Sequence, residues 1–183
     1  MNPLQAGILL ISDPFLKDPN FIRTVVLLCE HQEQGSFGFV LNKPLGLMLS
    51  DLITGAEGLY IPVSEGGPVQ KDSLHFLHCR PDLIEGGLKI ADNIHWGGNF
   101  GLALSLLQTK ELLPTEIRFF VGYSGWGEMQ LEQELDERSW ITRPAKNHLI
   151  FKKEIRTIWK EALTELGGEY SQMVNYPIDP QLN

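Results

Sequence analysis

The sequence predicts an α+β fold built mainly from antiparallel β-hairpins, with few helices, most of them late in the chain. Short apolar runs alternate with polar or glycine-containing turns through the first half, and helical spacing of apolar residues is strongest in the second half. Hairpins followed by helices favour this class over a doubly wound parallel sheet. The 183 residues are 43% hydrophobic and 21% charged, which fits one compact domain over residues 1–183.

Three strands are expected in the first quarter of the chain, at residues 7–12, 24–29 and 37–41. The run at 24–29 is apolar throughout, so we expect it to be buried on both faces. A polar loop of four or five residues should connect it to 37–41, and Asn42-Lys43-Pro44 should end this hairpin.

The middle of the chain is expected to be the most irregular part. A short helix at 50–54 precedes residues 55–68, which are rich in glycine and proline. Residues 73–80 then predict a strand in which odd and even side chains point to opposite faces. Two short runs, 88–90 and 94–96, follow the Gly86-Gly87 turn and predict a second hairpin.

The remaining segments predict three helices and two strands. In order, they are a helix capped by Asn99, a strand at 116–123, a turn at 125–127, a helix at 128–138, a strand at 139–143 and a helix at 153–166. Residues 171–183 have no periodicity and are expected to be an extended tail, either disordered or lying across the surface.

Charge and composition exclude some classes of function. The formal net charge of −8 opposes contact with phosphate backbones, so direct nucleic-acid binding ranks last. No apolar run approaches the roughly 20 residues that span a bilayer, so no membrane association is expected. Two cysteines, Cys29 and Cys79, lie in apolar segments and are typical of free thiols in the cytoplasm.

Several side chains could carry chemistry. Ser124 lies between glycines after a strand, but the nucleophile elbow of α/β-hydrolases needs a glycine where Trp126 stands, so a packed turn is the preferred interpretation. The histidines and cysteines lack metal-ligand spacing, and neither a metal nor another cofactor is expected. His31 and His78 stay candidates for acid–base work because imidazole titrates near neutrality.

A series of short motifs then occurs in a characteristic order. They are Gly38-Phe39-Val40-Leu41-Asn42-Lys43-Pro44, Gly66-Gly67-Pro68-Val69, Leu77-His78, Gly122-Tyr123-Ser124-Gly125-Trp126 and Gln130-Leu131-Glu132-Gln133-Glu134. On these motifs the chain resembles the bacterial YqgE/AlgH family over nearly its whole length. The resemblance implies several coiled β-sheets. It assigns no activity, although members are often labelled transcriptional regulators.

Two positions depart from the family pattern. Met129 stands where the family usually has glycine, which questions a flexible loop before the Gln-Leu-Glu motif. Ser124 stands where alanine is common, which further weakens a nucleophilic role.

The motif residues define one site hypothesis, because turns held by a rigid scaffold are where binding sites usually form. The candidate binding residues are His31, Asn42, Lys43, Gly66, Gly67, His78, Tyr123, Trp126, Gln130 and Glu132. If they converge, the site holds two imidazoles, an amine and a carboxylate. Alternatively, the glycines and Trp126 only define turns and packing.

Three functions remain open. The first is a regulatory or binding module without catalysis, acting through a protein or small-molecule partner. The second is an enzyme that uses His31 or His78 with Glu132 as acid–base groups. The third, ranked last, is a direct nucleic-acid binder.

Overall fold

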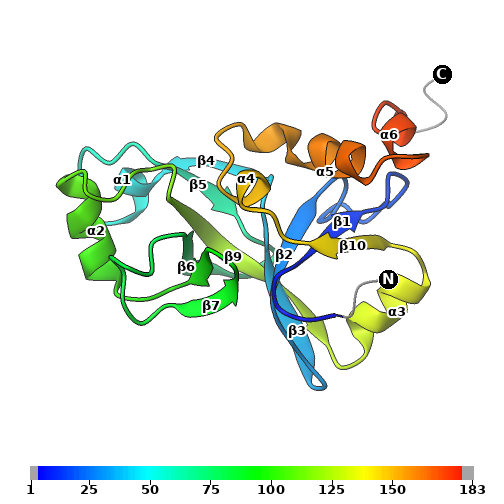
Figure 1. The fold of residues 1–183 in the computed structure, drawn as a ribbon, viewed down its shortest axis with the longest axis horizontal. Coiled ribbons are helices and arrows are strands. Elements are labelled where there is room, and N and C mark those ends of the chain that lie inside the picture. Colours follow the sequence, from blue (N-terminus) through cyan, green and yellow to red (C-terminus); the bar gives the residue numbers. More distant parts are fainter. Residues whose placement is uncertain (1–3, 179–183) are drawn as a thin grey trace.

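The computed structural model describes residues 4–178, whose strands join into one ten-stranded, curled sheet with helices around it (Figure 1). The strands are β1 (Ile8–Ser12), β2 (Val25–Gln32), β3 (Gly35–Val40), β4 (Pro44–Met48), β5 (Pro62–Glu65), β6 (Val69–His78), β7 (Leu88–Ala91), β8 (Ile94–Trp96), β9 (Ile117–Gly127) and β10 (Trp140–Pro144). The α-helices are α1 (Leu49–Leu52), α2 (Phe100–Gln108), α3 (Gln130–Asp136), α4 (Asn147–Ile150), α5 (Ile158–Leu166) and α6 (Tyr170–Met173). The predicted α+β class is confirmed.

Strand β9 joins the two halves of the sheet. The main path runs β10-β1-β2-β3-β9-β6-β8-β7, and β5 adds β4 to the side of β9. Pairing is antiparallel except between β5 and β9, which are parallel. Figure 1 shows β9 crossing from the half that carries α2 to the half that carries α3.

The expected turn at 125–127 is wrong, because these residues are the extended end of β9. Gly125 and Gly127 pair with Phe37 and Gly35 of β3. The irregularity lies earlier, at Gly122, which has a φ of +70° beside a register shift in β6. Glycine therefore bends this strand without ending it.

Two other expectations about the first half need correction. The loop between β2 and β3 is two residues long, not four or five, because polar His31 and Gln32 continue the ladder opposite Ser36 and Gly35. Asn42 and Lys43 do lie outside the strands, but β4 starts directly after them, at Pro44. The stretch 55–68, which was expected to be irregular, contains β5. Proline is tolerated as the first residue of a short edge strand.

The first two strands confirm the expected burial on both faces. Leu9 and Leu27 belong to the core that includes Trp159 of α5, whereas Leu10 and Val26 belong to the core that includes Trp126 and Trp140. The predicted alternation at 73–80 is confirmed too, and a third core unites β6, β9 and α2.

The helices that the sequence predicts are present at the expected places, but their lengths differ from those expected. Asn99 caps α2 by accepting a hydrogen bond from the Leu102 amide at 3.0 Å. A short 3-10 turn, Ile155–Thr157, precedes α5 where one long helix was expected. α4 was not predicted from the sequence.

The tail is only partly extended. Residues 170–173 form α6, Val174 is buried in the same core as Trp159, and the Tyr176 carbonyl accepts a hydrogen bond from Arg23. Of the two expectations for the tail, residues 171–178 therefore agree with the one in which it lies across the surface. Residues 179–183 lie outside the described part.

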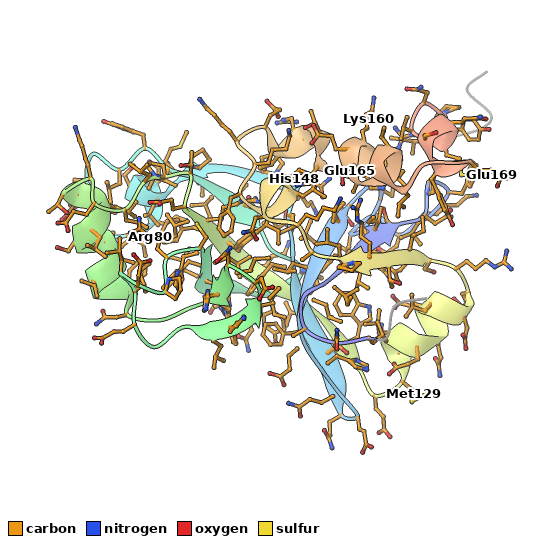
Figure 2. All side chains as sticks on the ribbon, viewed as in Figure 1. Arg80, Met129, His148, Lys160, Glu165 and Glu169 are labelled. Carbon is orange, nitrogen blue, oxygen red and sulfur yellow. The ribbon has the colours of Figure 1, made fainter. Side chains whose placement is uncertain are left out.

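Glu165 connects α5 to β10 and to the segment that follows β10. Its carboxylate lies 2.9 Å from Arg143, 3.1 Å from Lys146 and 2.6 Å from His148; Figure 2 shows His148 and Glu165 at the junction of α4 and α5. Burial alone would raise the pKa of Glu165. The hydrogen bonds and charges of its cationic neighbours outweigh burial and lower this pKa from 4.5 to about 2.

We expect Glu165→Gln to destabilise the protein by about 1–2 kcal/mol above pH 5, a modest loss because solvent screens these partners. The folded pKa lies below the ordinary value, so this stabilisation is present above pH 4.5 and is lost as pH falls toward 2. Urea unfolding at several pH values checks this. Wild-type and variant curves that stay parallel down to pH 2 would contradict it.

Substitution of Gly66 tests the contact between the Gly66-Gly67 turn and β9. A Cβ at Gly66 would lie 2.3 Å from the Gly122 carbonyl oxygen, so we expect Gly66→Ala to cost about 2–3 kcal/mol. The matched control is Gly101→Ala in α2, where the nearest outside atom is 3.6 Å away and a gain of about 0.5–1 kcal/mol is expected. Neither glycine has a left-handed φ, so backbone strain contributes to neither of the two free energies of unfolding that chemical denaturation measures.

Candidate functional site

A cavity of about 530 Å³ lies between the β2–β3 hairpin and strands β6, β8 and β9. Its walls are aromatic and come from four different strands: Phe37, His75, Trp96 and Tyr123. All four side chains are partly exposed, so they form the surface that a ligand would meet. Polar side chains of the hairpin, including Glu30 and Gln32, complete the lining.

Strand pairing explains why the aromatic rings meet. Glu30 pairs with Phe37, and Phe37 pairs with Gly125, so all three face the same side of the sheet. Gly125 has no side chain, and a Cβ there would lie 3.4 Å from the Tyr123 ring. The glycine therefore leaves open the space that the cavity occupies.

The rings are packed edge-on or tilted. The Phe37 and Trp96 centroids are 4.8 Å apart at 61°, those of Phe37 and Tyr123 are 6.0 Å apart at 79°, and those of His75 and Tyr123 are 6.2 Å apart at 90°. Aromatic pairs prefer such arrangements, and rings at different angles hold one another in place. The cavity is thus largely preformed.

The charge of the lining comes from one carboxylate. Glu30 is exposed and accepts a hydrogen bond from Gln32 at 2.7 Å. Burial lowers the pKa of His75, whose Nε2 lies 3.0 Å from the Ser73 hydroxyl. Burial therefore favours the neutral imidazole, and the charged side chain among the described lining residues is that of Glu30.

Of the candidate residues, Tyr123 and Trp126 border this cavity. The Trp126 indole itself is buried on the other face of the sheet and donates to Glu134 at 2.9 Å. Gln130 donates to the same carboxylate at 3.0 Å and accepts from the Gly127 amide at 3.0 Å. These two side chains fasten α3 to the end of β9.

The structure brings His31 and Glu132 together. The His31 Nε2 lies 3.5 Å from a Glu132 oxygen, and its Nδ1 lies 2.8 Å from the Ser36 hydroxyl. The three side chains come from β2, β3 and α3 and are all partly exposed. A serine, an imidazole and a carboxylate in this order are the components of a hydrolytic triad.

The other candidates stabilise the fold. Asn42 accepts a hydrogen bond from the Val25 amide at 2.9 Å and donates to the Arg23 carbonyl at 2.8 Å. Gly66 and Gly67 are buried against β9, and Lys43 pairs with Glu65 at 3.5 Å. Ser124 is fully buried and donates to the Gly66 carbonyl at 3.1 Å, which gives a structural reason against a nucleophilic role.

His78 lies in a separate cluster. It is buried, stacks on His95 at 5.5 Å, and its Nε2 lies 3.1 Å from the Gly97 carbonyl oxygen. Burial, assisted by the neighbouring His95, lowers its pKa. The two imidazoles of the site hypothesis therefore do not share one site.

Most of the residues that line the cavity were absent from the predicted set, among them Phe37, His75, Trp96 and Gly125. Phe37 and His75 each lie on a predicted strand, so alternation could assign them a face but not a common neighbour. In residues 4–178, no group of three His, Cys, Asp or Glu side chains could hold a metal ion. That part of the chain also contains no helix long and apolar enough to cross a bilayer.

Comparison with known proteins identifies the family. A family model described as AlgH-like matches residues 9–171. The chain belongs to the AlgH-like family. Curated relatives include a UPF0301 protein of Chlorobium limicola, 45% identical over 98% of this chain and 96% of that protein, and one of Cytophaga hutchinsonii, 44% identical over 98% and 100%. The resemblance stated from the motifs is thereby confirmed.

Two solved structures of similar proteins have the same fold. The AlgH protein of Pseudomonas aeruginosa is 29% identical, with a TM-score of 0.73 over 93% of each chain. The protein DIP2367 of Corynebacterium diphtheriae is 19% identical, with a TM-score of 0.79 over 96% of this chain and 94% of that chain.

Met129 is labelled in Figure 2 at the turn between β9 and α3. Its φ is +58°, in the left-handed region that glycine adopts most easily. Met129 therefore has a backbone conformation that costs a non-glycine residue free energy, and its side chain is exposed.

Proposed function

We propose that this AlgH-like protein is a small-molecule binding module and that its ligand occupies the aromatic cavity. The observation that carries the proposal is the meeting of four aromatic side chains around about 530 Å³ of space. Ligand sites are typically concave, mostly apolar and largely preformed, with a few polar groups. The hairpin carboxylate and amides supply those polar groups here.

A regulatory role follows naturally from such a site. The cavity lies where the β2–β3 hairpin meets β8 and β9, so a bound ligand would contact both halves of the sheet. It would thereby change how firmly the hairpin is held, which a protein partner could detect.

We place the protein in the cytoplasm on account of its free thiols, Cys29 and Cys79. The net charge of −8 disfavours nucleic acid as its partner.

Filling the cavity tests the binding proposal. In Gly125→Leu the new side chain would enter the space beside Tyr123, so we expect loss of ligand without loss of folding. The protein is incubated with a bacterial metabolite extract, desalted and analysed by native mass spectrometry. Wild type should retain a small molecule that Gly125→Leu releases.

The matched control is Gly127→Leu on the same strand, since a Cβ at Gly127 would lie no closer than 4.0 Å to another residue's atom, that of the Gln130 side chain, and Gly127 does not line the cavity. It should retain the molecule as wild type does. Retention by all three proteins, or by none, would contradict the proposal, and thermal melts confirm that each is folded.

A second candidate, a serine hydrolase, is favoured by one specific observation, the contact of His31 with both Ser36 and Glu132. In this reaction, the Ser36 oxygen would attack an ester carbonyl while His31 accepts the hydroxyl proton. Glu132 would stabilise the imidazolium, the alcohol would leave with the proton, and water would release the acid. His78 takes no part because it lies in the separate His95 cluster.

A fluorophosphonate probe tests this second candidate. We expect it to label Ser36 and to do so at least about 100-fold more slowly in His31→Gln, because general-base assistance is removed. Peptide mapping locates the label. The fully buried Ser124 is the internal control, and absence of label on Ser36 in wild type would exclude the hydrolase.

A further inference from the structure

We infer that the aromatic cavity selects small organic cations, in which an ammonium group carries apolar substituents. This inference rests on the proposed binding function and specifies the chemical class of its ligand. Three features carry it: the aromatic walls, the sign of the charge in the lining and the burial of the imidazole between aromatic rings.

The aromatic walls are suited to a cation. The faces of Trp, Tyr and Phe rings carry negative electrostatic potential and attract ammonium groups within about 6 Å of the ring centroid. Trp96, Tyr123 and Phe37 come from three strands and are inclined to one another, Phe37 meeting the other two at 61° and 79°. A ligand in the cavity would therefore contact the exposed surface of more than one ring, and clustered rings of this kind recognise quaternary ammonium groups.

The charge of the lining has the matching sign. Glu30 contributes a carboxylate, and none of the lining residues within the described range 4–178 is lysine or arginine. The nearest lysine along β6 from the cavity residue Val69 is Lys71, which is paired with Glu65 at 3.1 Å. An anion in this cavity would therefore meet one negative charge and no compensating positive one.

The imidazole does not reverse this balance. His75 is partly buried between Phe39 and Tyr123, with ring centroids at 5.2 and 6.2 Å. Its burial favours the uncharged ring, which adds a fourth aromatic wall in place of a competing cation.

A pair of isosteres isolates the effect of charge. Choline is the cationic probe, and neohexyl alcohol, in which carbon replaces the nitrogen, is the neutral one. Titrations at pH 7.5 are followed by NMR, with the indole N–H of Trp96 as reporter. We expect choline to bind about 5- to 30-fold more tightly than neohexyl alcohol, the range that one or more cation–π contacts supply.

Three variants locate the preference. Glu30→Gln keeps the shape of the lining but removes its charge, and should weaken choline about 3-fold while leaving neohexyl alcohol unchanged. Glu33→Gln, at the exposed hairpin tip outside the lining, is the matched control and should change neither. Tyr123→Leu keeps an apolar wall but removes a ring, so it should reduce the ratio of the two affinities.

The outcomes separate this inference from the proposed function. A choline preference that falls in Glu30→Gln and Tyr123→Leu but not in Glu33→Gln supports it. Equal binding of both probes overturns the charge preference and leaves the cavity as a ligand site. Absence of any Trp96 response to choline overturns the inference as well, and the Gly125→Leu comparison then decides whether the cavity binds another class of molecule.

Discussion

The architecture depends on how closely the Gly66-Gly67 turn approaches β9. The Gly66 amide donates to the Val121 carbonyl at 2.8 Å, and a Cβ on Gly67 would lie 2.2 Å from the carbonyl carbon of Tyr123. No other residue type fits this contact without moving the backbone. Because the turn delivers β5 to one side of β9 and β6 to the other, the contact fixes the strand on which both halves of the sheet depend.

The cavity follows from this arrangement. Once β9 is fixed, its C-terminal end, residues 124–127, is free to pair with β3, and this pairing aligns Phe37 with Gly125. The N-terminal part of β9, residues 117–123, pairs with β6, which carries His75 and pairs in turn with β8 at Trp96. Aromatic residues from separate parts of the chain therefore meet around a glycine, although none of them belongs to the turn that made the meeting possible.

The difference between local patterns and long-range strand pairing explains what the sequence could predict. Strands such as β1 and β2 are recognisable because residues 8–11 and 25–29 are apolar throughout, and the cap at Asn99 is recognisable because its chemistry is local. β4 and β5 are short, and they are stabilised by partners far along the chain. The glycines of β9 indicate a turn when read locally, and only pairing with β3 holds them extended.

The same reasoning applies to the candidate site. Motif residues such as Asn42 and Gly66 were selected because they have unusual chemistry or conformation, and these properties are what building a constrained backbone requires. Ligand contact requires only a suitable face, which Phe37 and Trp96 provide without any distinguishing pattern in the chain. His31 and Glu132 were named from the sequence and do meet, but Ser36, which completes the group, is an ordinary hairpin serine. In this fold the conspicuous residues therefore set the geometry, and the residues that meet a ligand are ordinary ones that this geometry brings together.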